Sequence, residues 1–513
     1  MPTKSNSPET ISPPTSTSWT GLAAYIFSFP VMCLFLLVLA IYGFSVRRIA
    51  EADIWWHLRN AAYLFQNHSF ASVDSYSFGA AGSPWLDHEW LSEIPFFLGL
   101  KAGGLQGMLA VYFVALVLIY IGVYYRSCRA GADCKDATVI TFLAILLGGV
   151  SIGPRMLLFG WLCMVGLLLV MDGFQRTGKG LWLLPALFAL WINLHGSWVF
   201  GLVVLVMIIG SGLVEGEWGL VVAQRWSTAE LRKLLLALGV SLAALFVNPF
   251  GYRLVLFPLK YEILLRRHDV MQRIVEWQGV DFSTAHGKLA LMVIFGLLAA
   301  ALFSQQRWKL DEVLLTAFAL WAALSHLRFL FFAGLIMAPI LAPRLKLFPP
   351  YERELDKPWL NAGIMAAVVG GMIFFYPSAA QLQQQVDQEY PTAALEFMQR
   401  QHLNGRIFNQ DWWGGYMEWV TPELKPYMDG RTDIFVENGT FDDYINAVLI
   451  RSPLEVLDKY KIDYVLLEPA KPPAYVLEHS PAWRPIYTDK VAVLFERTPK
   501  TAAAEAPAKV RSN

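Results

Sequence analysis

Long apolar runs recur along the chain, and each of them has to be buried in protein or in lipid. A helix that crosses a membrane needs about 20 predominantly apolar residues. Candidate runs, alone or as tight pairs, lie near 20–44, 105–125, 138–153, 156–172, 180–192, 197–213, 233–248, 288–304, 311–325, 329–343 and 359–377. Several of them are shorter than about 20 residues, and 180–192 is the shortest. The pattern predicts a multi-pass α-helical membrane protein with about 11 transmembrane helices.

The composition also favours a membrane protein. Of 513 residues, 56% are hydrophobic and only 16% are charged, whereas about a quarter of the residues of a soluble domain are charged. The formal net charge is zero. The chain therefore lacks the basic excess typical of nucleic-acid-binding proteins, and we expect no nucleic acid partner.

The distribution of Lys and Arg predicts the orientation of the chain. With the N-terminus in the cytoplasm, the short inside loops carry most of the basic residues, and the short outside turns carry only Arg155 and Arg328. This agrees with the positive-inside rule. Two long outside loops then cover 45–104 and 249–287, and an odd number of spans places the C-terminal region outside as well.

Segments of different character divide the chain. Residues 1–18 are rich in Ser, Thr and Pro, which is typical of a disordered tail, and residues 19–378 form the predicted transmembrane domain. Residues 385–498 predict a small soluble α/β domain, with helices in "YPTAALEFMQRQH" and "SPLEVLDKY", strands in "GRIFN" and "IDYVLLE", and a hairpin in "WRPIYTDKVAVLFER". Residues 499–513 are predicted to be a second disordered tail.

The first outside loop begins with acidic, histidine and tryptophan residues in "RRIAEADIWWHLRN". If this part is helical, Asp53 and His57 share a face because they are four residues apart. Trp55 and Trp56 are then expected at the membrane surface. Charged and aromatic residues at that level suit a substrate with a polar head and a lipid tail. In the plainer interpretation Asp53 caps the helix, His57 is solvated and the tryptophans are interfacial anchors.

The same loop continues with "GSPWLDHEWLSEIPFF", which places Asp87, His88 and Glu89 before a second amphipathic stretch. Acidic and histidine side chains also suit a divalent metal. No ligand spacing here is diagnostic, so a metal is an open alternative, and no cofactor is certain. The ligands of such a metal would be Asp53, His57, His88 and Glu89.

Two further charged residues are predicted near the outer membrane surface. Glu276 lies in the second long outside loop, in "RIVEWQG", and Arg328 lies in "SHLRFLFF" at the outer end of two spans. An arginine in apolar surroundings is costly unless it reaches water or meets an anion. A lipid phosphate is a suitable anion because Arg binds its oxygens bidentately.

The C-terminal region contains the motif "NQDWWGGYMEWV" and, after it, "YMDGRTD". Gly414 and Gly415 predict a tight turn with close backbone approach. Asp429 and Arg431 are expected at the exposed end of a strand. The alternative for these two residues is a structural corner with an internal Asp–Arg pair.

With these features together, the chain resembles the GT-C class of membrane glycosyltransferases, which use polyprenyl-phosphate-linked sugars. The resemblance rests on Asp53 and the later "DHEW" in a long first outside loop, on about 11 spans, and on the C-terminal α/β domain. In that class the first outside loop carries an essential acidic residue. Asp53 matches it best, and Glu89 is the second candidate.

The run "WWGGY" resembles the WWDYG motif that binds the acceptor sequon in the oligosaccharyltransferase catalytic subunit. This likeness implies that Trp412, Trp413 and Tyr416 lie on the acceptor side, together with Asp429 and Arg431. Gly414 replaces the acid of that motif, which argues against peptide N-glycosylation. The chain also resembles bacterial multi-pass membrane proteins that share the patterns "DxWWH", "NLHG", "NPFG" and "DGR", which implies a bacterial inner membrane.

The resemblance implies a direct displacement of the lipid phosphate by an extracytoplasmic acceptor, which is a glycan, a lipid or a protein. Asp53 is the expected general base. The residues expected to bind the donor or its phosphate are His57, His88, Arg328, Trp55, Trp56 and Glu276. The sequence leaves three alternatives open: a transporter or flippase for a lipid-linked substrate, a binding protein that has kept the fold without the chemistry, and a ligase that transfers a whole glycan.

Overall fold

A computed structural model describes residues 19–46, 49, 51–151, 153–267 and 275–499. The chain forms two compact units. Unit 1 comprises Met1–Arg47, Leu109–Pro258 and Asp269–Pro377, and unit 2 comprises Arg48–Met108, Leu259–His268 and Ser378–Asn513. Apart from Pro499, the two predicted tails lie outside the described residues.

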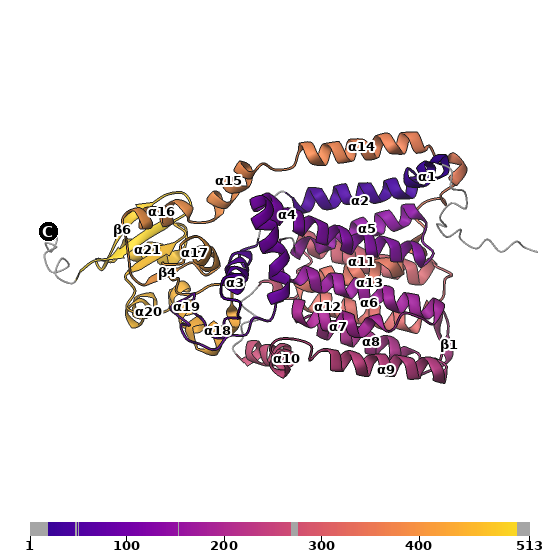
Figure 1. Cartoon of the computed structure of the whole chain (residues 1–513), viewed down its shortest axis with the longest axis horizontal. Coiled ribbons are helices and arrows are strands. Elements are labelled where there is room, and N and C mark those ends of the chain that lie inside the picture. The colour runs from indigo at the N-terminus through magenta and orange to yellow at the C-terminus, as the bar shows by residue number, and fades with distance from the viewer. Residues whose placement is uncertain (1–18, 47–48, 50, 152, 268–274, 500–513) are drawn as a thin grey trace, which may run out of the picture. The chain divides into compact units, whose positions relative to one another are not determined.

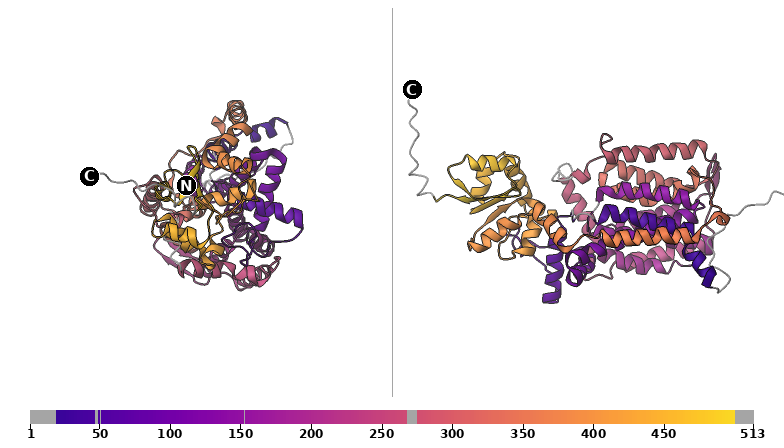
Figure 2. Two further views of the ribbon diagram at one scale, coloured as in Figure 1. Left: turned by 90° about the vertical axis from the view of Figure 1, so that its left-hand side faces the viewer. Right: turned by 90° about the horizontal axis from the view of Figure 1, so that it is seen from above.

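Unit 1 is a bundle of helices that run side by side (Figures 1 and 2). Its helices are α1 (Trp19–Ile26), α2 (Phe29–Ser45), the second part of α4 (Trp90–Arg129), α5 (Cys134–Gly148), α6 (Leu157–Thr177), α7 (Leu183–Leu194), α8 (Trp198–Ser211), α9 (Thr228–Ala244), α11 (Ala285–Phe303), α12 (Leu310–Ser325), α13 (Leu330–Leu345) and α14 (Pro358–Phe374). Another helix, α10 (Tyr252–Arg267), carries the chain from unit 1 into unit 2.

The apolar helices make this chain an integral membrane protein. Among the described residues, five helices are long and apolar enough to cross a membrane, and a sixth is added if α14 and α15 (Ala379–Glu389) form one bent span. Every other predicted apolar run also contains a helix, but a shorter one. The total of about 11 spans therefore stays a prediction.

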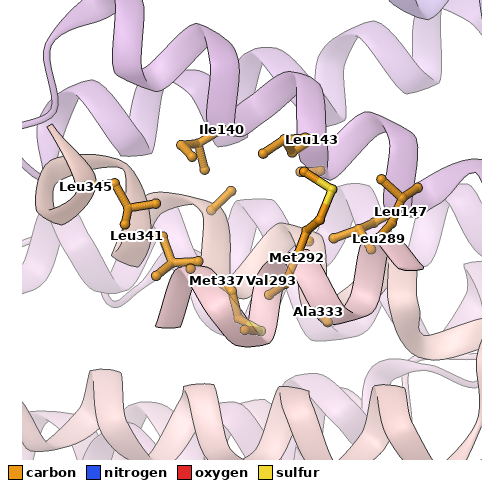
Figure 3. A pocket seen from close by; sticks show the side chains of 14 residues that line it. Ile140, Leu143, Leu147, Leu289, Met292, Val293, Ala333, Met337, Leu341 and Leu345 are labelled. Atoms are coloured by element: carbon orange, nitrogen blue, oxygen red, sulfur yellow. The ribbon is translucent and has the colours of Figure 1, made fainter. Parts of the chain in front are cut away.

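Apolar packing holds unit 1 together around α13, which is buried along its whole length from Leu330 to Arg344. Its Phe331 and Phe332 stack on Trp161 of α6, with ring centroids 6.1 and 5.6 Å apart. A cavity of about 70 Å³ lies between α5, α11 and α13 (Figure 3). Its lining consists of aliphatic side chains, methionine and glycine, so it offers no side chain for chemistry.

A three-stranded sheet joins two connecting segments of unit 1. It consists of β1 (Gly216–Trp218), β2 (Val221–Ala223) and β3 (Trp308–Lys309). β1 pairs with β2 antiparallel, and β2 pairs with β3 parallel. The sheet thus ties the segment between α8 and α9 to the segment between α11 and α12.

Unit 2 contains a four-stranded mixed sheet in the order β4-β5-β7-β6. Its strands are β4 (Ile407–Asn409), β5 (Tyr464–Leu467), β6 (Trp483–Thr488) and β7 (Val493–Arg497). The sheet is accompanied by α15, α16 (Thr392–Arg400), η6 (Asp411–Trp413), α17 (Gly414–Val420), α18 (Thr432–Glu437), α19 (Thr440–Val448), α20 (Pro453–Lys459) and α21 (Pro472–Glu478). The two predicted strands, the hairpin and both predicted helices are present.

The first outside loop folds into unit 2 and packs on its C-terminal part. It forms α3 (Ile54–Asn67) and the first part of α4, which is interrupted at Gly103 and Gly104. Between these helices, the backbone N–H groups of Phe78 and Gly79 donate to the carbonyls of Pro426 and Tyr427 at 3.0 and 3.2 Å. Residues more than 300 positions apart in the sequence therefore form one core.

Candidate active site

The first turn of α3 carries two of the predicted site residues. Asp53 occupies the N-cap position, and the backbone N–H of His57 donates to its carbonyl at 3.2 Å. The two residues are therefore one helical turn apart, as their spacing predicts. In the described part of this turn, the Asp53 carboxylate does not cap α3, which argues against the plainer interpretation of this residue.

His57 lies in a cluster of polar side chains between α3 and the start of α4. Its Nδ1 is 2.8 Å from Glu93 Oε1, and its Nε2 is 3.5 Å from Glu89 Oε2. Glu89 Oε1 in turn lies 3.8 Å from His88 Nε2, and the Trp56 ring stacks on the imidazole. The plainer interpretation, in which His57 is solvated, is wrong, because His57 connects a buried carboxylate to one that is 12% exposed.

Asn60 joins this His57 cluster to Asp87. Its amide donates to Asp87 Oδ2 and to Glu93 Oε2, and its carbonyl accepts from the Tyr76 hydroxyl at 3.3 Å. One amide therefore holds two buried carboxylates. Neither Asn60 nor Glu93 was among the predicted site residues. The available signal was that Asn60 follows His57 by three positions and so shares its helix face.

Burial raises the pKa of Asp87 to about 7, although the hydrogen bond from Asn60 acts in the opposite direction. The folded protein therefore holds this proton more tightly than the unfolded chain, and the free energy of unfolding falls as pH rises from about 4 to 7. A shift of this size corresponds to roughly 4 kcal/mol. We expect Asp87→Asn to make this part of the profile less steep, measured as thermal unfolding in detergent across that pH range.

A matched control for this change is Asp387→Asn, which neutralises an exposed carboxylate on α15. This variant should keep the wild-type slope. If Asp87→Asn kept that slope as well, burial would not raise the pKa of Asp87, and this account of the carboxyl would be wrong.

A second cluster surrounds Arg431. Its Nε and Nη2 bind Asp429 at 2.9 and 2.6 Å, and Nη2 also lies 2.8 Å from Asp74 and 3.4 Å from Glu418. The guanidinium carbon lies 5.0 Å from the centre of the Tyr76 ring. This Arg431 cluster links the first outside loop, through Asp74, to the C-terminal part of unit 2.

The expectation that Asp429 and Arg431 lie at the exposed end of a strand is wrong. They are 1% and 3% exposed, and the described segment before them makes only an isolated bridge between Ile407 and Pro426. Burial raises the pKa of Asp429, but the charge of Arg431 outweighs it and the pKa is lowered. Burial and the charge of Asp429 raise the pKa of Glu418. The contacts favour the internal ion pair.

The tryptophans of α3 are buried, so the expectation that they lie on the membrane surface is wrong. Trp55 and Trp56 are 2% and 6% exposed. Trp55 packs edge-on against Tyr390 and Tyr416, with ring centroids 5.6 and 5.0 Å apart. Their apolar area is covered by the C-terminal part of unit 2, which removes it from water more completely than an interface would.

The "WWGGY" motif forms the end of η6 and the start of α17. Trp413 is buried and donates from Nε1 to Glu389 O at 3.1 Å, while Trp412 is half-buried and donates to Glu468 Oε1 at 3.2 Å. The Tyr416 hydroxyl lies 2.9 Å from Thr392 Oγ1. The predicted tight turn is absent from this described segment, because both glycines belong to a helix. The predicted close backbone approach is confirmed.

Glu276 and Arg328 lie in unit 1. The Glu276 carboxylate pairs with Arg155 at 2.5 Å, and the Arg328 guanidinium carbon lies 4.5 Å from the centre of the Trp277 ring. Burial raises the pKa of Glu276, but the hydrogen bond and charge of Arg155 outweigh this effect and lower it. Glu276 is therefore an anion already neutralised in part by arginine.

The side chains considered as metal ligands do not form a metal site in this structure. Within the part of the chain that the structure describes, no three His, Cys, Asp or Glu side chains are arranged to hold an ion. Asp53, His57, His88 and Glu89 therefore do not build a metal centre by themselves in the described structure, and the chemistry proposed below is derived from the side chains alone.

The structure thus groups the predicted site residues by unit. Unit 2 holds the acids, histidines and tryptophans of the first outside loop and the residues of the two C-terminal motifs. The contacts between Trp55 and Tyr416 bring residues of the two segments together. Glu276 and Arg328 belong to unit 1.

The fold is shared with solved structures of an oligosaccharyltransferase from Archaeoglobus fulgidus. The crystal structure of the apo form aligns with a TM-score of 0.50 and 12% identity over 85% of this chain and 69% of that one. The archaeal oligosaccharyltransferase AglB, in complex with an inhibitory peptide and a dolichol-phosphate, aligns with a TM-score of 0.50 and 13% identity over 88% of this chain and 70% of that one. No protein-family model and no curated protein matches in sequence. The predicted distant likeness to oligosaccharyltransferase is confirmed for the fold.

Proposed function

We propose that this protein is a membrane glycosyltransferase that moves a sugar from a polyprenyl-phosphate donor to an extracytoplasmic acceptor. The observation that carries the proposal is the fold shared with AglB, whose solved complex contains a dolichol-phosphate and a peptide. A lipid phosphate is therefore the donor class we favour. The proposal includes about 11 spans, a cytoplasmic N-terminus, an extracytoplasmic C-terminal domain and a bacterial inner membrane.

In the proposed reaction Asp53 is the general base. It takes the proton of an acceptor hydroxyl while that oxygen attacks the anomeric carbon of the donor. The bond between the anomeric carbon and the phosphate oxygen breaks, and the polyprenyl phosphate leaves as an anion. One displacement of this kind inverts the configuration of the anomeric carbon. Glu89 is the second candidate for the base, because it is also partly exposed.

Cationic and polar groups are proposed to bind the donor. Arg328 is suited to a phosphate because its guanidinium offers a fork of N–H donors, and its guanidinium carbon lies 4.5 Å from the centre of the Trp277 ring. His88, which is partly exposed beside Glu89, would stabilise developing negative charge when protonated. His57 would orient Glu89.

The C-terminal motifs are proposed to form the acceptor side. Trp412 is half-buried, and we assign its ring the role of stacking on the acceptor. Trp413, Tyr416, Asp429 and Arg431 are buried, and we assign them the task of holding this surface in shape. Trp412→Ala should therefore raise the KM for the acceptor more than it lowers kcat.

A vesicle experiment tests transfer against the alternative of transport. Purified protein is reconstituted into liposomes that contain a polyprenyl phosphate with a labelled sugar, and a panel of water-soluble acceptors is added outside. A transferase releases the sugar from its phosphate and labels an acceptor. A flippase moves the intact donor between leaflets, and a binding protein leaves it where it was; either result would refute the proposed function.

A further inference from the structure

Two glycines of the C-terminal motifs lie against the first turn of α3. A Cβ atom on Gly430 would overlap Asp53 Oδ1, so the carboxylate occupies the space where a side chain would begin. A Cβ atom on Gly415 would lie 3.0 Å from the backbone nitrogen of Trp56 and 3.3 Å from its Cβ. We call Gly415 and Gly430 the glycine seat.

The two segments that carry Gly415 and Gly430 are also in close contact with each other. A Cβ atom on Gly414 would overlap the carbonyl oxygen of Met428 and lie 2.7 Å from Asp429 Cα. The start of α17 and the segment before Gly430 therefore touch backbone to backbone. The "WWGGY" and "DGR" motifs form one surface through this contact, with α3 on it.

The segment that carries Gly430 is held in place and has little freedom to retreat. Asn409 donates to Met428 O at 2.9 Å, and the backbone N–H of Thr432 donates to Gly430 O at 2.8 Å. The neighbouring Arg431 is fixed by three hydrogen bonds to Asp429, one of them from its backbone N–H, and by an ion pair with Asp74. If a side chain were added at position 430, the short Asp53 side chain would move and the backbone would not.

We propose that the glycine seat positions the Asp53 carboxylate, with Gly430 as the positioning residue that sets its orientation. This inference rests on the proposed function, because it assigns to the two motifs the task of aligning the general base. A base has to lie within hydrogen-bond reach of the proton it takes, and a displacement of about 1 Å can lower the rate by about 10²-fold. The absence of a side chain at position 430 then leaves the space that the Asp53 carboxylate needs in its catalytic orientation.

Gly430→Ala is the direct test, because Gly430 does not have a left-handed backbone conformation and alanine brings no backbone strain. We expect kcat to fall by about 10²-fold while the KM for the donor changes little. Gly415→Ala should have a smaller effect, since its neighbour needs to move by only a few tenths of an ångström. Gly239→Ala on α9 is the matched control, because nothing lies within 4 Å of its added Cβ.

A double variant and an experimental structure separate positioning from a general loss of fold. In the Asp53→Asn background, Gly430→Ala should cost no further activity, because the group it displaces is already inactive. The structure of Gly430→Ala should show the Asp53 carboxylate rotated away and the Arg431 cluster intact. Wild-type kcat in Gly430→Ala, a further loss in the double variant, or an unmoved Asp53 would each overturn the proposal. If the wild type transfers no sugar, the proposed function is refuted. The position of Asp53 in the structure of Gly430→Ala still tests the positioning proposal in that case.

Discussion

Asp53→Asn should strongly lower the rate of sugar transfer while the protein stays folded. The amide keeps the shape of the side chain but has no lone pair basic enough to accept the hydroxyl proton, and general base catalysis contributes about 10² to 10⁴-fold. The fall should appear in kcat, measured as release of labelled sugar from its polyprenyl phosphate. Donor binding should survive, because the base is needed only when the acceptor attacks.

The control for this variant is again Asp387→Asn on the exposed face of α15. It removes the same charge from unit 2 at a residue to which the proposed mechanism assigns no role. This variant should leave kcat unchanged. Full activity in Asp53→Asn would remove Asp53 from the mechanism. If Glu89→Gln then lost the activity, the base would be Glu89.

Arg431→Met should be among the most destabilising single substitutions in unit 2. It leaves Asp74, Asp429 and Glu418 buried without their common cation. Removing one partner of a buried ion pair typically costs about 3–5 kcal/mol, because the remaining charge is then uncompensated. The measurement is the free energy of unfolding in denaturant, followed by a probe in unit 2.

Arg400→Met is the matched control for this prediction. Arg400 pairs with Glu396 on α16, and their side chains are 70% and 61% exposed. Surface pairs of this kind contribute about 0–1 kcal/mol, so the loss should be small. Equal losses in the two variants would show that the Arg431 cluster adds no more to stability than a surface pair does.

Sequence patterns with local causes were predicted well. The apolar runs became helices because a spanning segment satisfies its own backbone hydrogen bonds. The helix after Asp53 and the strands "GRIFN" and "IDYVLLE" followed from short-range periodicity and apolar content. These elements depend on residues that are close in the chain, and a single sequence displays such relations directly.

The arrangement of the site depended on contacts between distant residues. Asp74 and Arg431 are 357 positions apart, and no spacing rule relates them. Trp55 and Trp56 were expected at an interface because their partners, such as Tyr416, lie far along the chain. The two glycines of the motif did predict a close backbone approach. The sequence could not show that the group lying against Gly430 is the Asp53 carboxylate.

The most direct test of the central claim is the fate of the donor with purified wild-type protein. A panel of polyprenyl phosphates with labelled sugars is incubated with a panel of acceptors, and both products are quantified by mass spectrometry. The account predicts equal amounts of free polyprenyl phosphate and glycosylated acceptor, with the anomeric configuration inverted. A donor that stays intact across the panel would contradict the assignment as a glycosyltransferase, and a product with retained configuration would contradict a single displacement assisted by Asp53.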